Sequence, residues 1–203
     1  MTSTSFTTFL NSITTEPTGQ WFGSDYYGLK PDLMTIAKGL TSGYVPMGGV
    51  IVRDEVVKVI NEGGDFNHGF TYSGHPVAAA VALENIRIMR DEQIVETVRA
   101  QTAPYLQKRL RELADHPLVG EVRGLGMLGA IELVKDKATR ARHEGRGAGM
   151  ICRQFCFDNG LIMRAVGDTM IIAPPLVINC AEIDELVDKA RMCLDLTLEA
   201  LGG

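Results

Sequence analysis

The feature that most constrains the fold is the alternation of short apolar segments with helical patterns after about residue 19. Apolar runs bounded by glycine, proline or aspartate predict strands, whereas apolar residues recurring every three or four positions predict helices. Such alternation is typical of α/β folds, and the division near residues 100–115 predicts two α/β units. The expected strands are 33–37, 49–52, 119–122, 128–133, 161–165 and 169–173, and the expected helices are 54–61, 75–89, 91–113, 147–159 and 179–201.

Three local signals refine these helices. Pro76 suits a first helical turn, where its missing N–H costs nothing. Pro104 falls inside a helical pattern, so we expect a kink or a break there. Residues 179–182 have the form of a capping box, with asparagine where Ser or Thr is usual.

Composition excludes several function classes. The chain has 203 residues, 45% of them hydrophobic and 22% charged, with a net charge of −5, which suits globular units with a real core. An acidic balance without a basic stripe argues against nucleic acid as a partner. No apolar run approaches the roughly 20 residues that span a bilayer, and the N-terminus does not resemble a secretory signal.

The cysteines lie within helical or strand patterns, which favours reduced thiols in a cytoplasmic protein. Cys152 and Cys156 share a helical face, but without a second pair nearby we expect no metal site. Residues 1–18, rich in Thr and Ser with Glu16 as the one charged residue, predict a disordered lead-in.

Lys38 ends a mostly apolar, extended segment and precedes a glycine-punctuated loop. An ammonium among apolar neighbours loses hydration, which favours the neutral, nucleophilic amine that Schiff-base chemistry needs. The plainer interpretation is a lysine that reaches from a strand end into water. Local sequence alone favours that plainer interpretation.

Two further positions have similar alternatives. The loop 70–76 precedes a helix, where hydroxyls and free N–H groups suit a phosphate, although an ordinary capping loop has the same composition. Arg164 stands in an apolar strand and could hold a carboxylate through two hydrogen bonds, or could simply reach solvent. The run 124–129 matches GxGxxG, but a strand and not a helix is expected after it, so we reject a dinucleotide site.

Longer motifs decide between these alternatives. Residues 21–40, 44–50 and 64–76 resemble class III aminotransferases, which are pyridoxal 5'-phosphate (PLP) enzymes of fold type I, and within them the ω-transaminases that pass an amino group from amines or diamines to pyruvate. The resemblance implies a partial large, cofactor-binding domain with a mixed sheet at 19–112 and a small C-terminal α/β domain at 113–203. It implies a small-molecule amine and a keto acid as substrates.

The resemblance also implies residue roles. Lys38 corresponds to the lysine that forms the Schiff base with PLP, and Arg164 to the arginine that binds the acceptor's carboxylate. Phe70 and Thr71 belong to the phosphate-binding motif, in which the threonine contacts the cofactor of the neighbouring subunit. A homodimer with shared active sites follows from that role.

Other elements of the family pattern are not found in this sequence. The family places an aspartate against the pyridine nitrogen about thirty residues before the lysine, where it makes the ring an electron sink. Here the corresponding residues 7–11 contain no acid, and the glycine/serine cup for the phosphate is missing too. We therefore expect weak or no activity of this chain alone. The alternative is a catalytically silent remnant that acts as a folding or dimerisation unit.

Overall fold

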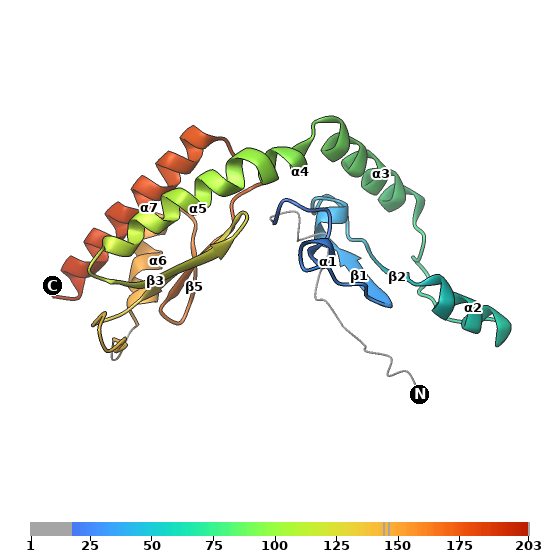
Figure 1. The fold of residues 1–203 in the computed structure, drawn as a ribbon, viewed down its shortest axis with the longest axis horizontal. Coiled ribbons are helices and arrows are strands. Elements are labelled where there is room, and N and C mark those ends of the chain that lie inside the picture. The colour runs from blue at the N-terminus through green and yellow to red at the C-terminus, as the bar shows by residue number, and fades with distance from the viewer. Residues whose placement is uncertain (1–17, 144, 146, 203) are drawn as a thin grey trace. The chain divides into compact units, whose positions relative to one another are not determined.

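The computed structural model describes residues 18–143, 145 and 147–202 (Figure 1). The predicted lead-in and residues 7–11 therefore lie outside the described residues, except for Thr18. Contacts divide the chain into two compact units: unit 1 contains residues 20–96, and unit 2 contains residues 97–202 together with Thr18 and Gly19. The division falls inside α4 (Ile94–Thr97). The helical residues that follow pack within unit 2, against β3 and α7.

Unit 1 is built around one antiparallel pair of strands. The ladder runs from the Leu33–Val52 pair to the Ala37–Gly48 pair. The predicted strands and helices of this unit are confirmed, with ends that shift by a residue or two because helix and strand termini fray. The elements are α1 (Gly23–Tyr26), β1 (Leu33–Ala37), η2 (Lys38–Leu40), β2 (Gly48–Val52), α2 (Asp54–Glu62) and α3 (Pro76–Asp91).

The core of unit 1 is small. Leu40 and Ala82 are buried against each other, so the turn after β1 packs on the middle of α3. Much of β2 stays exposed, including Val50 and Ile51. Further apolar side chains pack partly buried around this contact, namely Phe22, Ile36, Met47 and Ile86.

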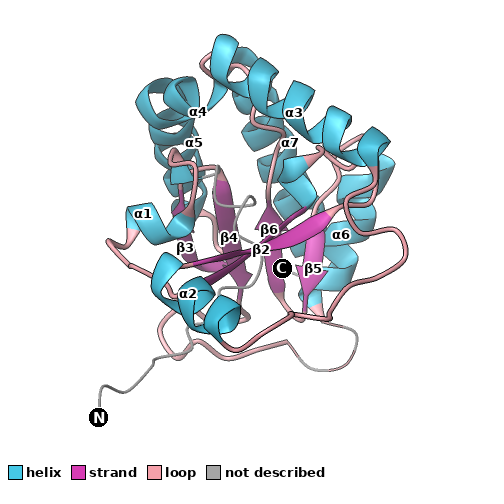
Figure 2. Ribbon diagram, turned by 90° about the vertical axis from the view of Figure 1, so that its right-hand side faces the viewer, coloured by secondary structure: helices cyan, strands magenta, loops and turns pink. Residues whose placement is uncertain are grey.

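Unit 2 contains a four-stranded antiparallel sheet in the order β3-β4-β6-β5. Burial alternates along β4 and β6, so the sheet has one well-buried face. The helices α5, α6 and α7 pack together and against the sheet (Figures 1 and 2). The elements are η3 (Val98–Thr102), α5 (Ala103–Arg111), η4 (Glu112–Asp115), β3 (Val119–Leu125), β4 (Leu128–Leu133), α6 (Ala148–Asp158), β5 (Arg164–Val166), β6 (Thr169–Ile172) and α7 (Cys180–Ala200).

Two tight hairpins form this sheet. Leu125 pairs with Leu128, so β3 and β4 are joined by a two-residue loop that starts with Gly126 at a φ of +61°. Such loops favour positive φ at their first residue, where glycine pays no steric penalty. The GxGxxG run thus lies in a hairpin followed by a strand, and the rejection of a dinucleotide fingerprint is confirmed. The loop of the β5–β6 hairpin is Gly167-Asp168, with Gly167 at +58°.

The long helix predicted at 91–113 is irregular, as Pro104 suggested. A π-helical turn, η3, lies immediately before α5, and Pro104 occupies the first turn of α5. A proline cannot donate to the carbonyl four residues back, so the regular ladder must be broken upstream of it. The helix therefore adopts a wider turn over residues 98–102.

The predicted start of α7 is confirmed, whereas the predicted start of β5 is shifted along the chain. Asn179 Oδ1 accepts from the Glu182 N–H at 3.0 Å and Glu182 Oε2 accepts from the Asn179 N–H at 2.9 Å, so the predicted capping box is confirmed. The strand predicted at 161–165 begins only at Arg164. Leu161 and Met163 are buried and Ile162 is exposed, so side chains alternate as in a strand before ladder pairing begins.

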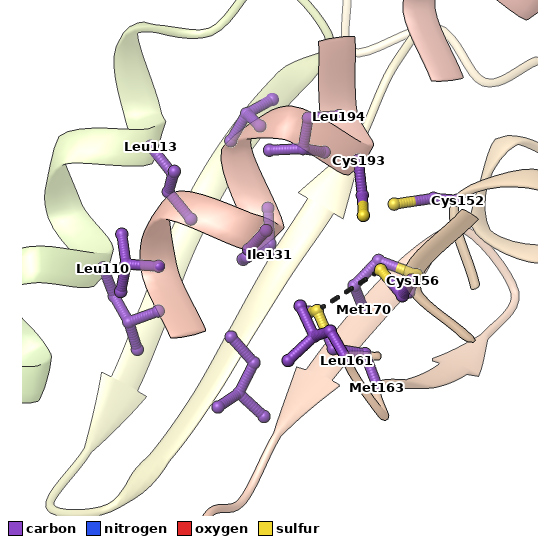
Figure 3. Packing of buried hydrophobic residues seen from close by; sticks show 14 of the residues in the cluster. Leu110, Leu113, Ile131, Cys152, Cys156, Leu161, Met163, Met170, Cys193 and Leu194 are labelled. Carbon is purple, nitrogen blue, oxygen red and sulfur yellow. Dashed lines mark hydrogen bonds between the residues drawn. The ribbon is translucent and has the colours of Figure 1, made fainter. Parts of the chain in front are cut away.

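The core of unit 2 is continuous and includes three cysteines (Figure 3). Cys156 contacts Met163 through their sulfur atoms, 3.8 Å apart. All four cysteines are free thiols, and Cys180 alone of the four is exposed. Fully buried large side chains in this core include Leu106, Leu110, Leu113, Leu118, Met127, Ile131, Leu133, Met170, Ile183 and Leu194.

The described residues contain neither a membrane-spanning helix nor a cluster of metal-binding side chains. No helix in them has the length and apolar character needed to cross a membrane. No cluster of three or more histidine, cysteine or acidic side chains in the same residues could hold a metal ion.

Candidate active site

Lys38 follows directly on β1 and opens the turn η2, as the sequence indicated. Its φ is +53°, in the left-handed region that side-chain-bearing residues rarely adopt. A residue held there costs about 1–3 kcal/mol, which the surrounding structure must offset. The side chain is exposed and not enclosed by apolar neighbours, which agrees with the plainer interpretation of a lysine that reaches into water and differs from the dry environment considered as its alternative.

Hydrogen bonds to α3 hold the turn that carries Lys38. Asn85 Nδ2 donates to the carbonyl oxygens of Gly39 at 2.7 Å and Leu40 at 3.3 Å, and Asn85 Oδ1 accepts from Ser42 Oγ at 2.7 Å. Asn85 was not among the site residues predicted from the sequence. A polar residue on the same helical face as Ala82 and Met89, both buried, was the available signal.

A cavity of about 490 Å³ begins beside this strand end. Gly48 lines it and pairs with Ala37 across the β1–β2 ladder. Lys38 directly follows Ala37 in the chain, so it lies one residue beyond this pair. The walls are mainly apolar. Neither Lys38 nor Thr71 is itself a lining residue; the lining residues are Val45, Pro46, Met47, Gly48, Phe70, Tyr72, Ser73, Gly74, His75, Val77 and Ala78.

The loop 70–75 closes the other side of the cavity. The Phe70 N–H donates to Ser73 Oγ and the Ser73 N–H donates to the Phe70 carbonyl, both at 2.9 Å, which shapes a compact turn. Pro76 begins α3, and none of the side chains in the described part of the chain caps this helix start. The first turn of a helix has N–H groups without partners in the helix, and Val77 and Ala78 of that turn line the cavity. An anion would be favoured there.

Arg164 is the first residue of β5 and its side chain is exposed. Its backbone pairs with Ile171. Within the described part of the chain no carboxylate forms an ion pair with it. Arg164 belongs to unit 2, whereas Lys38, Phe70 and Thr71 belong to unit 1. The structure therefore groups three of the four predicted site residues in one unit.

Comparison with known proteins identifies the family. The family model for class-III aminotransferases matches residues 15–194. The chain belongs to this family. Class-III aminotransferases depend on PLP, so the family of this chain is one of PLP-dependent enzymes.

The relatives are transaminases that act on several amines. The putrescine–pyruvate aminotransferase of Pseudomonas aeruginosa is 72% identical over 184 residues, which are 91% of this chain and 40% of the relative. The mitochondrial gamma aminobutyrate transaminase 1 of Solanum lycopersicum is 45% identical over 174 residues, covering 83% of this chain and 34% of that protein. The chain thus spans well under half the length of these relatives.

Solved transaminase structures have the same fold. The ω-transaminase from Pseudomonas jessenii in complex with PMP superposes with a TM-score of 0.87 at 40% identity, over 92% of this chain and 42% of that chain. A thermostable 6-fold mutant from the same organism gives a TM-score of 0.88 at 39% identity, over 93% and 43% of the two chains. The α/β fold of the transaminases is therefore confirmed for the described residues.

Proposed function

We propose that Lys38 is the lysine that binds PLP covalently, and that the enzyme moves an amino group from an amine or ω-amino acid to pyruvate or a similar keto acid. One observation carries the proposal: Lys38 stands exposed on a strained turn, next to the strand end at which a cavity of about 490 Å³ begins. Strained backbone conformations cluster at functional sites.

The described residues fit part of the cofactor. A primary amine at Lys38 suits the cofactor's aldehyde. The N–H groups of the α3 first turn, with the loop carrying Phe70 and Thr71, suit a cofactor phosphate, which in the homodimer proposed below is that of the neighbouring subunit. When bound, PLP withdraws electrons from the substrate's amine-bearing carbon. Once the substrate's amine had replaced Lys38 on the cofactor, the freed Lys38 Nζ would take and return the proton at that carbon. Arg164 binds the carboxylate of the keto acid through paired hydrogen bonds.

The relatives support the substrate class. The relative at 72% identity is described as a putrescine–pyruvate aminotransferase, and the one at 45% as a gamma aminobutyrate transaminase. Both names denote enzymes that accept an amino group remote from any α-carboxylate. We extend that class to this chain, together with a homodimer in which Thr71 reaches the neighbouring subunit's cofactor, and with a cytoplasmic location.

Reductive trapping tests the proposal. The chain is incubated with PLP and reduced with borohydride, and the modified lysines are mapped by peptide mass spectrometry. We expect the label at Lys38 and its loss in Lys38→Ala, whereas Lys58→Ala, which removes an exposed lysine of α2, should leave it unchanged. Label spread equally over all lysines would refute a specific site.

Activity forms a second step of the same experiment. Turnover of putrescine or alanine with pyruvate, lost in Lys38→Ala, would support an enzyme. Specific labelling without turnover would support a cofactor site that is incomplete in this chain. Absence of both would favour the silent folding or dimerisation unit.

A further inference from the structure

Asn85 has an unusual set of partners for a helical asparagine. Within the described residues, all three of its hydrogen bonds to groups outside α3 reach the turn after β1. The two N–H donors face the carbonyl oxygens of Gly39 and Leu40, and the amide oxygen faces the hydroxyl of Ser42. One carboxamide therefore satisfies three polar groups within four residues of Lys38.

The backbone explains why this turn needs support. Lys38 and Ser42 have φ values of +53° and +48°, and they are two of the four non-glycine residues with positive φ in the described part of the chain. Lys38 and Ser42 are the two ends of residues 38–42, which include the three residues that Asn85 binds. A turn with two strained ends relaxes unless contacts hold it, because each left-handed residue favours the right-handed or extended regions.

The helix side of the contact is fixed by packing. Ala82 lies one turn before Asn85 and is buried against Leu40, and Met89 lies one turn after it and is buried as well. Met89 Sδ is 3.6 Å from Asn85 Nδ2. The amide thus stands between two buried positions of α3, and the turn is attached to a rigid element.

The chemistry of the contact is specific to a carboxamide. The two carbonyl oxygens require donors, and the Ser42 hydroxyl requires an acceptor. The carboxamide of an asparagine or glutamine provides both in one group. An aspartate has the same shape but only acceptors when ionised, so it would face the two carbonyl oxygens with negative charge. A leucine has the same approximate volume and no hydrogen bond at all.

We propose that Asn85 is a positioning residue for Lys38, because it holds the turn, with left-handed residues at both ends, that sets where the amino group stands at the end of β1. The inference rests on the proposed function in that Lys38 is the amine that takes the cofactor. Asn85 acts through the turn and touches no reacting atom.

A measurement on the chain without cofactor tests the turn itself. The amides of Thr41, Ser42 and Tyr44 form the hydrogen bonds within and just after the turn, so their hydrogen exchange reports its opening. We expect exchange at least about tenfold faster in Asn85→Asp and Asn85→Leu, with β1 and unit 2 unchanged, and a smaller effect in Asn85→Gln. Asn61→Ala, at an exposed position of α2, is the matched control.

Trapping with PLP and borohydride then reads the position of Lys38. The ratio of label at Lys38 to label at Lys58 should fall about tenfold in Asn85→Asp and recover in part in Asn85→Gln. If Asn85→Leu unfolds unit 1, Ser42→Ala removes the donor to Oδ1 with a smaller change and should show the same pattern more weakly.

The outcomes separate the two proposals. Wild-type exchange and wild-type labelling in Asn85→Asp would overturn the positioning role while leaving the proposed function intact. Faster exchange throughout unit 1, in Ser42→Ala as well, would also overturn it, because Asn85 would then be a general stabiliser. Absence of PLP capture by the unsubstituted chain would refute the proposed function, and the exchange at residues 41–44 would still decide whether Asn85 holds the turn.

Discussion

Arg109 Nε donates to Asp184 Oδ1 at 2.8 Å, which ties α5 to the N-terminal part of α7 across 75 residues of sequence. The same guanidinium reaches Asp188 through Nη2 at 2.9 Å and pairs with Glu112 through Nη1. Its side chain is 19% exposed. A single arginine therefore links two helices of unit 2 through several carboxylates.

Removal of that guanidinium should weaken unit 2. Arg109→Met keeps the apolar stem and loses the ion pairs, and we expect the free energy of unfolding to fall by about 1 kcal/mol, the upper end for ion pairs near a surface. Urea unfolding followed by circular dichroism measures it. Arg153→Met removes an exposed arginine of α6 that has no ion pair among the described residues, and an equal loss in this control would contradict the role of the network.

Asp184 should make unit 2 sensitive to acid. The hydrogen bond from the Tyr105 hydroxyl, at 2.7 Å, and the charge of Arg109 lower the pKa of Asp184. A carboxylate with a depressed pKa in the folded state contributes stability above its unfolded pKa of about 4, and this contribution is lost as the pH falls through the folded value. Between pH 5 and 3, unfolding free energy should therefore fall more steeply in the wild type than in Asp184→Asn. Parallel pH profiles of the two proteins would rule the effect out.

The start of α7 should depend on its capping box. Asn179→Ala removes the acceptor for the Glu182 N–H and should lower the free energy of unfolding by about 1 kcal/mol. Asn179→Asp keeps an acceptor at the same position and should stay close to the wild type. Denaturant unfolding distinguishes them, and equal losses in both variants would show that the cap contributes nothing.

Thiol reactivity should divide the cysteines into two groups. Cys180 is exposed, whereas Cys152, Cys156 and Cys193 are buried. The hydrogen bond with Cys152 and burial raise the pKa of the Cys156 thiol, and burial raises the pKa of Cys193. With Ellman's reagent we expect rapid reaction of Cys180, lost in Cys180→Ser, and reaction of the others about 100-fold or more slowly, until denaturant is added. Rapid release of all four equivalents from the folded chain would contradict the packing of unit 2.

Local chemistry explains which parts of the fold were predictable. Asn179 and Glu182 satisfy each other within one turn, so their spacing alone specified the start of α7. Pro104 removes a hydrogen bond wherever it falls in a helix, so an irregularity was expected, although the choice of a π turn over residues 98–102 depends on packing. The strand expected from Leu161 begins later because ladder pairing depends on the partner strand, and β6 pairs from Arg164 onward.

The candidate site was predictable only in part, for a similar reason. Lys38 and the loop of Phe70 and Thr71 lie in long, specific motifs, so their resemblance to the family was visible in the sequence. Asn85 lies 47 positions after Lys38 and belongs to no such motif. Its role arises from the close approach of α3 to the turn after β1, which no periodicity in the sequence reveals.

The strand order of unit 2 has a consequence for how this unit folds. Each of its two hairpins closes a loop of two residues, whereas the β4–β6 seam joins residues 129–132 to 169–172. Loop closure costs more entropy as the separation grows, so the hairpins should form early and the seam late. Val122 pairs with Ile131 within the β3–β4 hairpin and lies outside the β4–β6 seam, so substitutions of Val122 should act mainly on the folding rate, which stopped-flow kinetics would measure. A change confined to the unfolding rate would mean that this hairpin forms after the rate-limiting step.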